Sequence, residues 1–79
     1  MTESQIQNKR IKELEKEGYY VIKTKLTNKN GMPDIIAIAP NSNVLFCEVK
    51  TKTGKVSKLQ EYRLNELEEY GFKTEVYRG

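Results

Sequence analysis

The sequence contains no histidine and only one cysteine among its 79 residues. A single cysteine excludes an intrachain disulfide, and without histidine the common zinc-finger ligand patterns cannot form. The lack of histidine also removes the most frequent general base, so proton transfer would have to use carboxylates, lysines or tyrosines. These absences exclude the disulfide-stabilised and zinc-finger classes of small protein.

The chain also lacks an apolar run long enough to cross a bilayer, and it shows no signal-peptide pattern. We therefore expect a cytoplasmic protein with no membrane partner. The length predicts one small domain that spans residues 1–79. A core of this size supplies only about 3–5 kcal/mol of stability, and a partner subunit is a common source of the rest. With a disulfide excluded, we predict a homodimer.

The charge balance favours a polyanionic partner. Lysine and arginine number 14 against 11 acidic residues, which gives a net charge of +3 and a pI near 9.0. No helix-turn-helix, zinc-finger or RNA-binding aromatic motif is evident, so recognition of base sequence is not expected. Any nucleic acid would be recognised by its shape and its backbone. The aromatic residues Tyr19, Tyr20, Tyr62 and Tyr70 are predicted to lie in the core or at a dimer interface.

The pattern of apolar residues, caps and turn residues predicts the element order α-β-β-β-α-β. The first helix begins at Thr2 or Ser4, and the second helix begins at Ser57, which is predicted as its N-cap. A polar loop is expected at residues 25–31. The first helix is expected to run from Thr2 or Ser4 to about residue 17, and the second from Ser57 to about residue 70. The expected strands are residues 19–24, 35–39, 44–49 and 72–77.

The stretch from Gly31 to Lys50 organises the chain. Its two apolar runs flank the turn-rich residues 40–43 and predict a β-hairpin with buried strands. Side chains alternate between the two faces of a strand, so Glu48 and Lys50 share one face. Simple pairing across the turn brings Asp34 close to both of them. Two carboxylates and one ammonium group should therefore converge at the end of an otherwise apolar sheet.

Burying these charges is costly unless they pair with one another or bind a metal ion. A salt bridge from Lys50 to one of the acids is one interpretation. A metal site is the other, because carboxylate oxygens suit Mg²⁺ or Mn²⁺. The residue types alone leave both interpretations open.

The motif Gly31-x-Pro33-Asp34, followed a hairpin later by Glu48-Val49-Lys50, resembles the PD-(D/E)xK nuclease superfamily. The next segment, Lys52-x-Gly54-x-x-Ser57-x-x-Gln60, is similar to the VRR-NUC branch of that superfamily. The resemblance covers nearly the whole chain, since the predicted order of elements also matches. It implies an α/β fold with a restriction-endonuclease-like αβββαβ core, in which two helices flank a mixed sheet.

The resemblance implies a metal-dependent DNA endonuclease that hydrolyses phosphodiester bonds with Mg²⁺ or Mn²⁺. Small stand-alone members of the family from viruses and bacteria are dimeric and resemble Holliday junction resolvases. The implied substrate is therefore branched or structured DNA. The implied location is the cytoplasm of a bacterial or phage-infected cell.

The family pattern also assigns roles to individual residues. Asp34 and Glu48 would be metal ligands, together with the backbone carbonyl of Val49. Lys50 would position or activate the attacking water and stabilise the developing charge. Gln60 matches an active-site glutamine that supports the lysine or the substrate. Some members carry a further outer ligand early in the first helix, and the matching residue here is Glu3.

Two groups of lysines bracket the expected site in the sequence. Their positions suit contacts with DNA phosphates, although solvated loop lysines would show the same pattern. The predicted DNA-binding residues are Lys23, Lys25, Lys29, Lys52, Lys55 and Lys58.

Two functions of other classes compete with the nuclease interpretation. A non-catalytic nucleic-acid-binding or assembly module could keep the same fold and would bind DNA without cutting it. A purely structural protein-interaction domain would neither bind nor cut.

Overall fold

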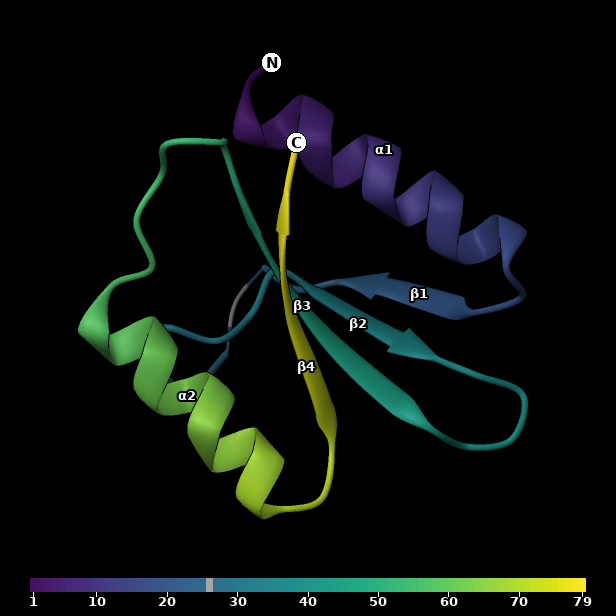
Figure 1. Ribbon diagram of the computed structural model, residues 1–79. Helices are drawn as coiled ribbons and strands as arrows, with labels where there is room; N and C mark the ends of the chain where they lie inside the picture. Colours follow the sequence, from purple (N-terminus) through teal and green to yellow (C-terminus); the bar gives the residue numbers. More distant parts are fainter. Residues whose placement is uncertain (26) are drawn as a thin grey trace.

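The order of helices and strands in the structure is the predicted one (Figure 1). The computed structural model describes residues 1–25 and 27–79, and Leu26, in the loop predicted for residues 25–31, lies outside the described residues. The elements are α1 (Glu3–Lys16), β1 (Tyr20–Lys23), β2 (Ile35–Ile38), β3 (Val44–Lys50), α2 (Lys58–Glu69) and β4 (Lys73–Arg78).

Helix α1 begins with a reciprocal cap between Thr2 and Gln5. The Thr2 hydroxyl accepts a hydrogen bond from the Gln5 N–H at 3.2 Å, and the Gln5 side chain accepts one from the Thr2 N–H at 2.9 Å. This arrangement satisfies backbone donors that have no partner inside the helix. It also decides between the two predicted caps, because Thr2 and not Ser4 takes the role. The helix ends before Gly18, whose φ of +96° is one that glycine adopts readily.

The four strands form one mixed sheet in the order β1-β2-β3-β4. Strands β1, β2 and β3 pair antiparallel, whereas β4 pairs parallel to β3. A parallel neighbour needs a crossover connection, and the segment containing α2 supplies it. The prediction of a mixed sheet flanked by two helices is therefore confirmed.

The core lies between α1 and one face of the sheet. Figure 1 shows α1 on one side of the strands and α2 on the other. The buried apolar cluster on the α1 side, in which every member is at most 1% exposed, comprises Ile6, Leu14, Ile35, Ala37, Cys47 and Val49. Because side chains alternate along β3, the cluster members Cys47 and Val49 leave Glu48 on the opposite face, toward α2.

An ion pair adds to the contact between α1 and β4. The Arg10 guanidinium donates two hydrogen bonds to the Glu75 carboxylate, at 2.8 and 3.1 Å, and lies 4.8 Å from the centre of the Tyr77 ring. Burial disfavours the charged guanidinium, but the Glu75 carboxylate outweighs this effect and the pKa of Arg10 is raised. Arg10 therefore stays charged and fixes α1 against the edge strand.

The face that carries α2 is less completely covered. Phe46 meets Phe72 edge to face with ring centres 5.5 Å apart. Tyr19 packs against the core cluster, as predicted, but Tyr20, Tyr62 and Tyr70 are 71%, 58% and 78% exposed. The core alternative was therefore wrong for these three tyrosines, because Tyr20 lies on the edge strand β1 and Tyr62 and Tyr70 lie on the solvent side of α2. Their place at a dimer interface stays a prediction.

We expect Cys47 to be chemically inert in the folded protein. The residue is fully buried, and this burial, together with the nearby Glu75 carboxylate, raises the pKa of its thiol above the usual value. Reaction with a disulfide reagent should then require opening of the core, and it should be slower than in guanidinium chloride by about a hundredfold or more. Absorbance of the released thiolate measures both rates.

A Ser4→Cys variant provides the control, because Ser4 is exposed on α1. Its added thiol should react rapidly without denaturant. Equally rapid reaction of Cys47 in the native wild-type protein would contradict the buried position.

Candidate active site

The pairing of β2 with β3 brings the two motif acids together. Ile35 lies opposite Cys47 in the antiparallel register, so Asp34 stands beside Glu48 at the open end of the hairpin. The Asp34 carboxylate accepts a hydrogen bond from the Val49 N–H at 2.9 Å. This bond holds the Asp34 side chain against the end of β3, in agreement with the predicted hairpin.

Glu48 is a buried carboxylate with two polar partners on the same oxygen. The residue is 2% exposed. Its Oε2 accepts a hydrogen bond from the Gln60 side-chain amide at 3.0 Å and lies 3.6 Å from the Lys50 Nζ. Burial and the nearby Asp34 carboxylate raise the pKa of Glu48 to about 7, although Lys50 acts in the opposite direction. Lys50 therefore offsets only part of the combined effect of burial and the Asp34 carboxylate on the pKa of Glu48.

The cap of α2 orients the glutamine. Ser57 and Gln60 form a reciprocal cap, in which the Ser57 hydroxyl accepts from the Gln60 N–H at 3.1 Å and the Gln60 Oε1 accepts from the Ser57 N–H at 3.0 Å. Because the amide oxygen is occupied in this way, the amide nitrogen is left to face Glu48. The prediction of Ser57 as the N-cap is confirmed. The spacing of serine and glutamine by three residues is a sequence signal for this cap that the prediction of Gln60 did not use.

Glu3 does not join the other acids in this structure. It is exposed in the first turn of α1. Within residues 1–25 and 27–79, no group of three histidine, cysteine, aspartate or glutamate side chains could together hold a metal ion. The structure therefore brings together Asp34, Glu48, Lys50 and Gln60, with Val49 between them in β3, and leaves Glu3 outside.

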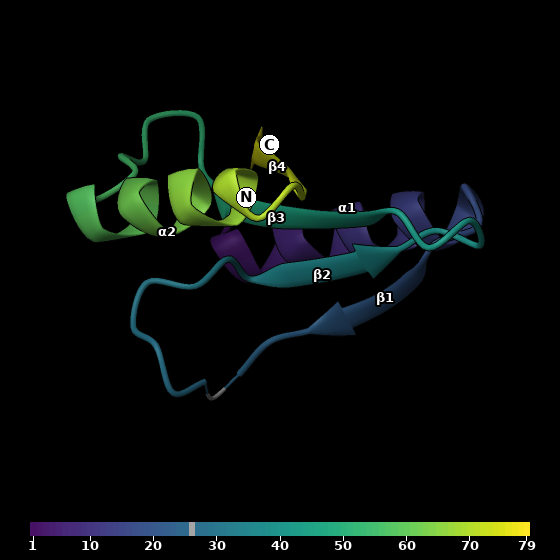
Figure 2. The same cartoon turned by 90° about the horizontal axis from the view of Figure 1, so that it is seen from below.

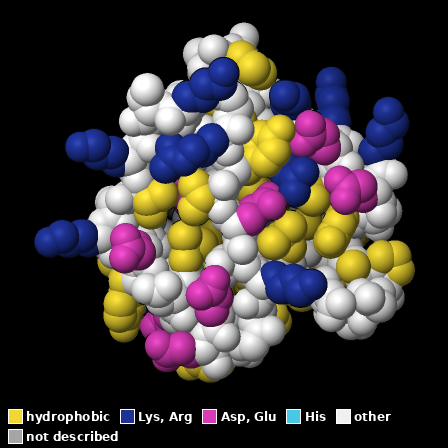
Figure 3. Space-filling model, in the orientation of Figure 1, with side chains coloured by type: hydrophobic (Ala, Val, Ile, Leu, Met, Phe, Trp, Pro, Cys, Tyr) yellow, Lys and Arg dark blue, Asp and Glu magenta, His cyan; other side chains and the backbone are white. Residues whose placement is uncertain are grey.

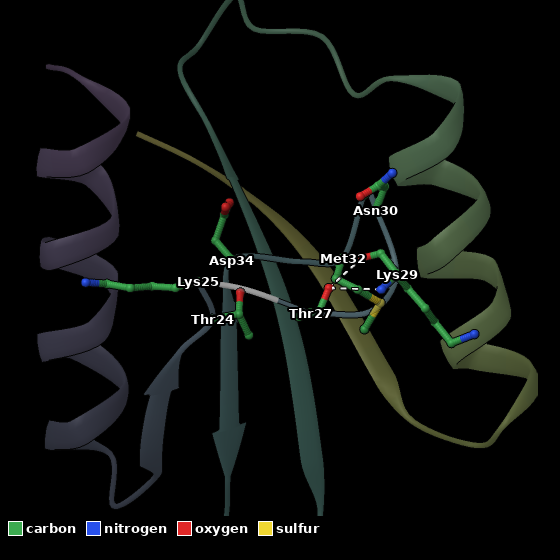
Figure 4. A pocket seen from close by; sticks show the side chains of 8 residues that line it. Thr24, Lys25, Thr27, Lys29, Asn30, Met32 and Asp34 are labelled. Carbon is green, nitrogen blue, oxygen red and sulfur yellow. Dashed lines mark hydrogen bonds between the residues drawn. The ribbon is translucent and has the colours of Figure 1, made fainter.

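The six predicted DNA-binding lysines are all exposed. Lys25 and Lys29 lie on the segment between β1 and β2, where they line a cavity whose wall includes Asp34 (Figure 4). Figure 2 shows this segment reaching beyond the strands at the same end of the sheet as α2. On the other side of the site, basic side chains project over the segment from β3 to the start of α2 (Figure 3). Lys25 and Lys29 therefore lie beside Asp34, whereas Lys23 ends β1 and Lys52, Lys55 and Lys58 lie between β3 and the first residue of α2.

Two arginines hold the loops on either side of the site. Arg63 on α2 donates to the Asn30 carbonyl at 2.9 Å. Arg78 at the end of β4 donates to the carbonyls of Thr51 (3.0 Å) and Gly54. The sequence did not predict either contact. The partner of Arg63 is 33 positions away and the partners of Arg78 are 27 and 24 positions away, and no local pattern indicates contacts over such separations.

Comparison with known proteins gives one family. The VRR-NUC domain model matches residues 1–79. This chain belongs to the VRR-NUC domain family. The family is nuclease-like and generally uses divalent metal ions, and a nuclease domain implies DNA as its substrate.

Two solved structures are similar to this VRR-NUC domain. One, described as "VRR_NUC domain", is 26% identical over 98% of this chain and 83% of its own, with a TM-score of 0.85. Another, described as "VRR_NUC domain protein", is 20% identical over 100% of this chain and 79% of its own, with a TM-score of 0.82, and at that identity it supports the fold alone. No curated protein matches the chain. Across the described parts of the chain, no helix has the length and apolar character needed to span a bilayer.

The side chains of this VRR-NUC domain suit a divalent cation. Both Asp34 and Glu48 offer carboxylate oxygens, which are the ligands that Mg²⁺ and Mn²⁺ prefer. Burial and the Asp34 carboxylate raise the pKa of Glu48 more than Lys50 lowers it, and a cation bound beside the two acids would act in the same direction as Lys50. The salt bridge and the metal site, which the residue types left open, are compatible: Lys50 contacts one oxygen of Glu48, and the Asp34 and Glu48 carboxylates have further oxygen atoms.

We expect the stability of the metal-free domain to fall as the pH rises. The pKa of Glu48 is about 7 in the folded state against an ordinary 4.5, so the folded state binds this proton more tightly. Its contribution to the free energy of unfolding is full below about pH 4.5 and is lost as the pH rises through about 7. In chelator, Glu48→Gln should remove this part of the pH dependence.

Urea denaturation at a series of pH values measures the effect. Glu69→Gln, which changes an exposed acid on α2, should keep the wild-type pH dependence. An unchanged profile in Glu48→Gln would contradict the raised pKa.

Proposed function

We propose that this VRR-NUC domain is a metal-dependent DNA endonuclease that hydrolyses phosphodiester bonds in branched or structured DNA, such as Holliday junctions. The observation that carries the proposal is the buried Glu48 carboxylate beside Asp34, with Lys50 within 3.6 Å. A structural ion pair needs only one acid for one lysine. The second carboxylate gives the site spare oxygen ligands, which a metal-dependent hydrolase uses.

Mg²⁺ or Mn²⁺ would be held by the carboxylates of Asp34 and Glu48 and by the backbone carbonyl of Val49. When bound, a divalent ion supplies positive charge for the phosphate oxygens and lowers the pKa of a coordinated water. The rigid sheet supports this role, because the two acids stand on paired strands and the Asp34 carboxylate is tied to the Val49 N–H.

Lys50 and Gln60 supply the remaining functions. The Lys50 side chain is only 12% exposed, so its ammonium group is partly desolvated beside the acids. It orients the attacking water and stabilises negative charge that develops on the phosphate oxygens. Gln60, fixed by its own helix cap, holds Oε2 of Glu48 and so keeps that carboxylate in one orientation.

The surrounding surface favours binding through the DNA backbone. Its flanking lysines are exposed, and a surface of this kind gives affinity that depends on salt and not on base sequence. The combination of a hydrolytic centre and a basic surround favours the endonuclease over the non-catalytic module, which would not need the acid pair.

We expect the purified domain to cut four-way-junction and plasmid DNA in Mg²⁺ or Mn²⁺ and to be inactive in EDTA. Glu48→Ala and Lys50→Ala should each lower the rate by about a hundredfold or more, because each removes a group that acts on the reacting phosphate. Gel assays of cleavage measure the rate, and the metal-induced rise in Tm measures binding of the ion independently.

Lys73→Ala is the control, since Lys73 is an exposed lysine at the start of β4. It should leave both cleavage and the metal-induced rise in Tm at wild-type levels. Binding of DNA without cutting under every metal would support the non-catalytic module instead. No rise in Tm with either metal would remove the basis for the proposed site.

We also propose that the domain is a homodimer. Several large apolar side chains are at least 37% exposed and support a covered surface, and they include Tyr20, Ile22, Leu59, Tyr62, Tyr70, Phe72 and Val76. Light scattering at micromolar concentration should give twice the chain mass of 9.2 kDa. The double variant Tyr20→Ser, Ile22→Ser should shift the mass toward the monomer, and Lys73→Ala should not. A monomeric wild-type protein would contradict the proposal.

A further inference from the structure

A polar cavity of about 230 Å³ opens beside the candidate active site. It lies between the segment that joins β1 to β2 and the start of β2 itself (Figure 4). The described residues that matter for its chemistry are Thr24, Lys25, Lys29, Asn30, Met32 and Asp34. Because Asp34 belongs both to this wall and to the acid pair, anything bound in the cavity would sit next to the reacting phosphate.

Hydrogen bonds fix both ends of the loop that forms the cavity. At one end, the Thr24 N–H donates to the Asp34 carbonyl at 2.9 Å and the Thr24 hydroxyl donates to the Pro33 carbonyl at 2.7 Å. At the other end, the Arg63 guanidinium donates to the Asn30 carbonyl at 2.9 Å. The loop is therefore anchored to β2 and to α2.

Close packing against α2 adds to this anchoring. Gly31 has a φ of +81°, and a Cβ at this position would lie 2.7 Å from the Leu59 side chain. Only glycine therefore allows the loop to approach the helix this closely. This close packing fixes the wall of the cavity against α2, the helix that carries Gln60.

The side chains around the cavity have unused binding capacity. Figure 4 shows the Lys25 and Lys29 side chains extending to opposite sides of the cavity. Among the described residues, no carboxylate lies within ion-pair distance of either lysine, and the Asn30 side-chain amide makes no hydrogen bond. Met32 adds a polarisable thioether.

These groups match the parts of one nucleotide. Two ammonium groups suit the phosphates on either side of it, and an amide offers both a donor and an acceptor to the edge of a base. The Met32 side chain offers an apolar contact for the face of the base. The chemistry of the cavity therefore fits a nucleotide better than it fits an isolated phosphate.

We propose that this cavity binds one unpaired nucleotide that adjoins the phosphodiester bond to be cut. The inference rests on the proposed endonuclease function and specifies its substrate. A base inside a duplex is stacked and paired, so it can enter a concave site only after leaving the helix. DNA that already has an unpaired nucleotide beside the scissile bond avoids this cost, and such DNA is the preferred substrate.

Binding can be tested without catalysis. In EDTA, NMR titration of the ¹⁵N-labelled protein with the trinucleotide d(TpTpT) should give saturable shifts of the amides around residues 24–34. The same trinucleotide with an abasic central residue should bind about tenfold more weakly, because contacts with the base are lost. Inorganic phosphate should give no saturable shifts in this segment.

Variants distinguish binding in the cavity from nonspecific attraction to positive charge. The double variant Lys25→Ala, Lys29→Ala and the single variant Asn30→Ala should each weaken trinucleotide binding by about fivefold or more. The control Lys16→Ala, Lys73→Ala removes the same charge from exposed positions at the end of α1 and the start of β4 and should leave binding unchanged. No saturable shift with either trinucleotide would overturn the inference.

Cleavage tests the consequence for the substrate. Wild-type protein with Mn²⁺ should cut a duplex with one unpaired nucleotide at least about tenfold faster than the fully paired duplex, and the Asn30→Ala variant should lose most of that preference. Equal rates on the two duplexes would overturn the inference while leaving the endonuclease intact. Absence of cleavage on every DNA would overturn the proposed function, and the titration would then still decide whether the cavity binds a nucleotide.

Discussion

The burial of Glu48 beside a second carboxylate, Asp34, at the open end of the β2–β3 hairpin is the constraint on which the rest of the structure depends. Glu48 is buried beside Asp34, and its pKa is raised to about 7 as a result. An arrangement of this kind costs stability, and a fold retains it only when surrounding contacts hold it in place. Those contacts come from Lys50, Gln60 and the Val49 N–H.

The two faces of strand β3 have different roles: one packs in the core and the other carries Glu48. On one face, Cys47 and Val49 pack with Ile6 and Leu14 of α1 and form the apolar core. On the other face, Glu48 meets the start of α2 through Gln60. The core thus fixes the strand, and the strand in turn fixes the acid. This division lets a small domain place charged groups at a site without opening its core.

The helix cap and the loop anchors connect the site to its surroundings. Gln60 is part of the α2 cap and also donates a hydrogen bond to Glu48. The position at which α2 begins therefore helps to fix the orientation of the Glu48 carboxylate. Arg63, one turn further along α2, holds the carbonyl of Asn30 beside the proposed nucleotide cavity. Helix α2 therefore supports both the proposed catalytic centre and the proposed substrate contact.

The sequence by itself determined the order of elements, the hairpin register and the convergence of Asp34, Glu48 and Lys50. These follow from local patterns, since strand alternation and a short turn decide which side chains meet. Tertiary structure alone decided that Glu3 stays apart, that Tyr20 is exposed and that Arg63 anchors the loop. Those outcomes depend on how helices lie against the sheet, and the packing of distant segments leaves no periodic signal in a single sequence.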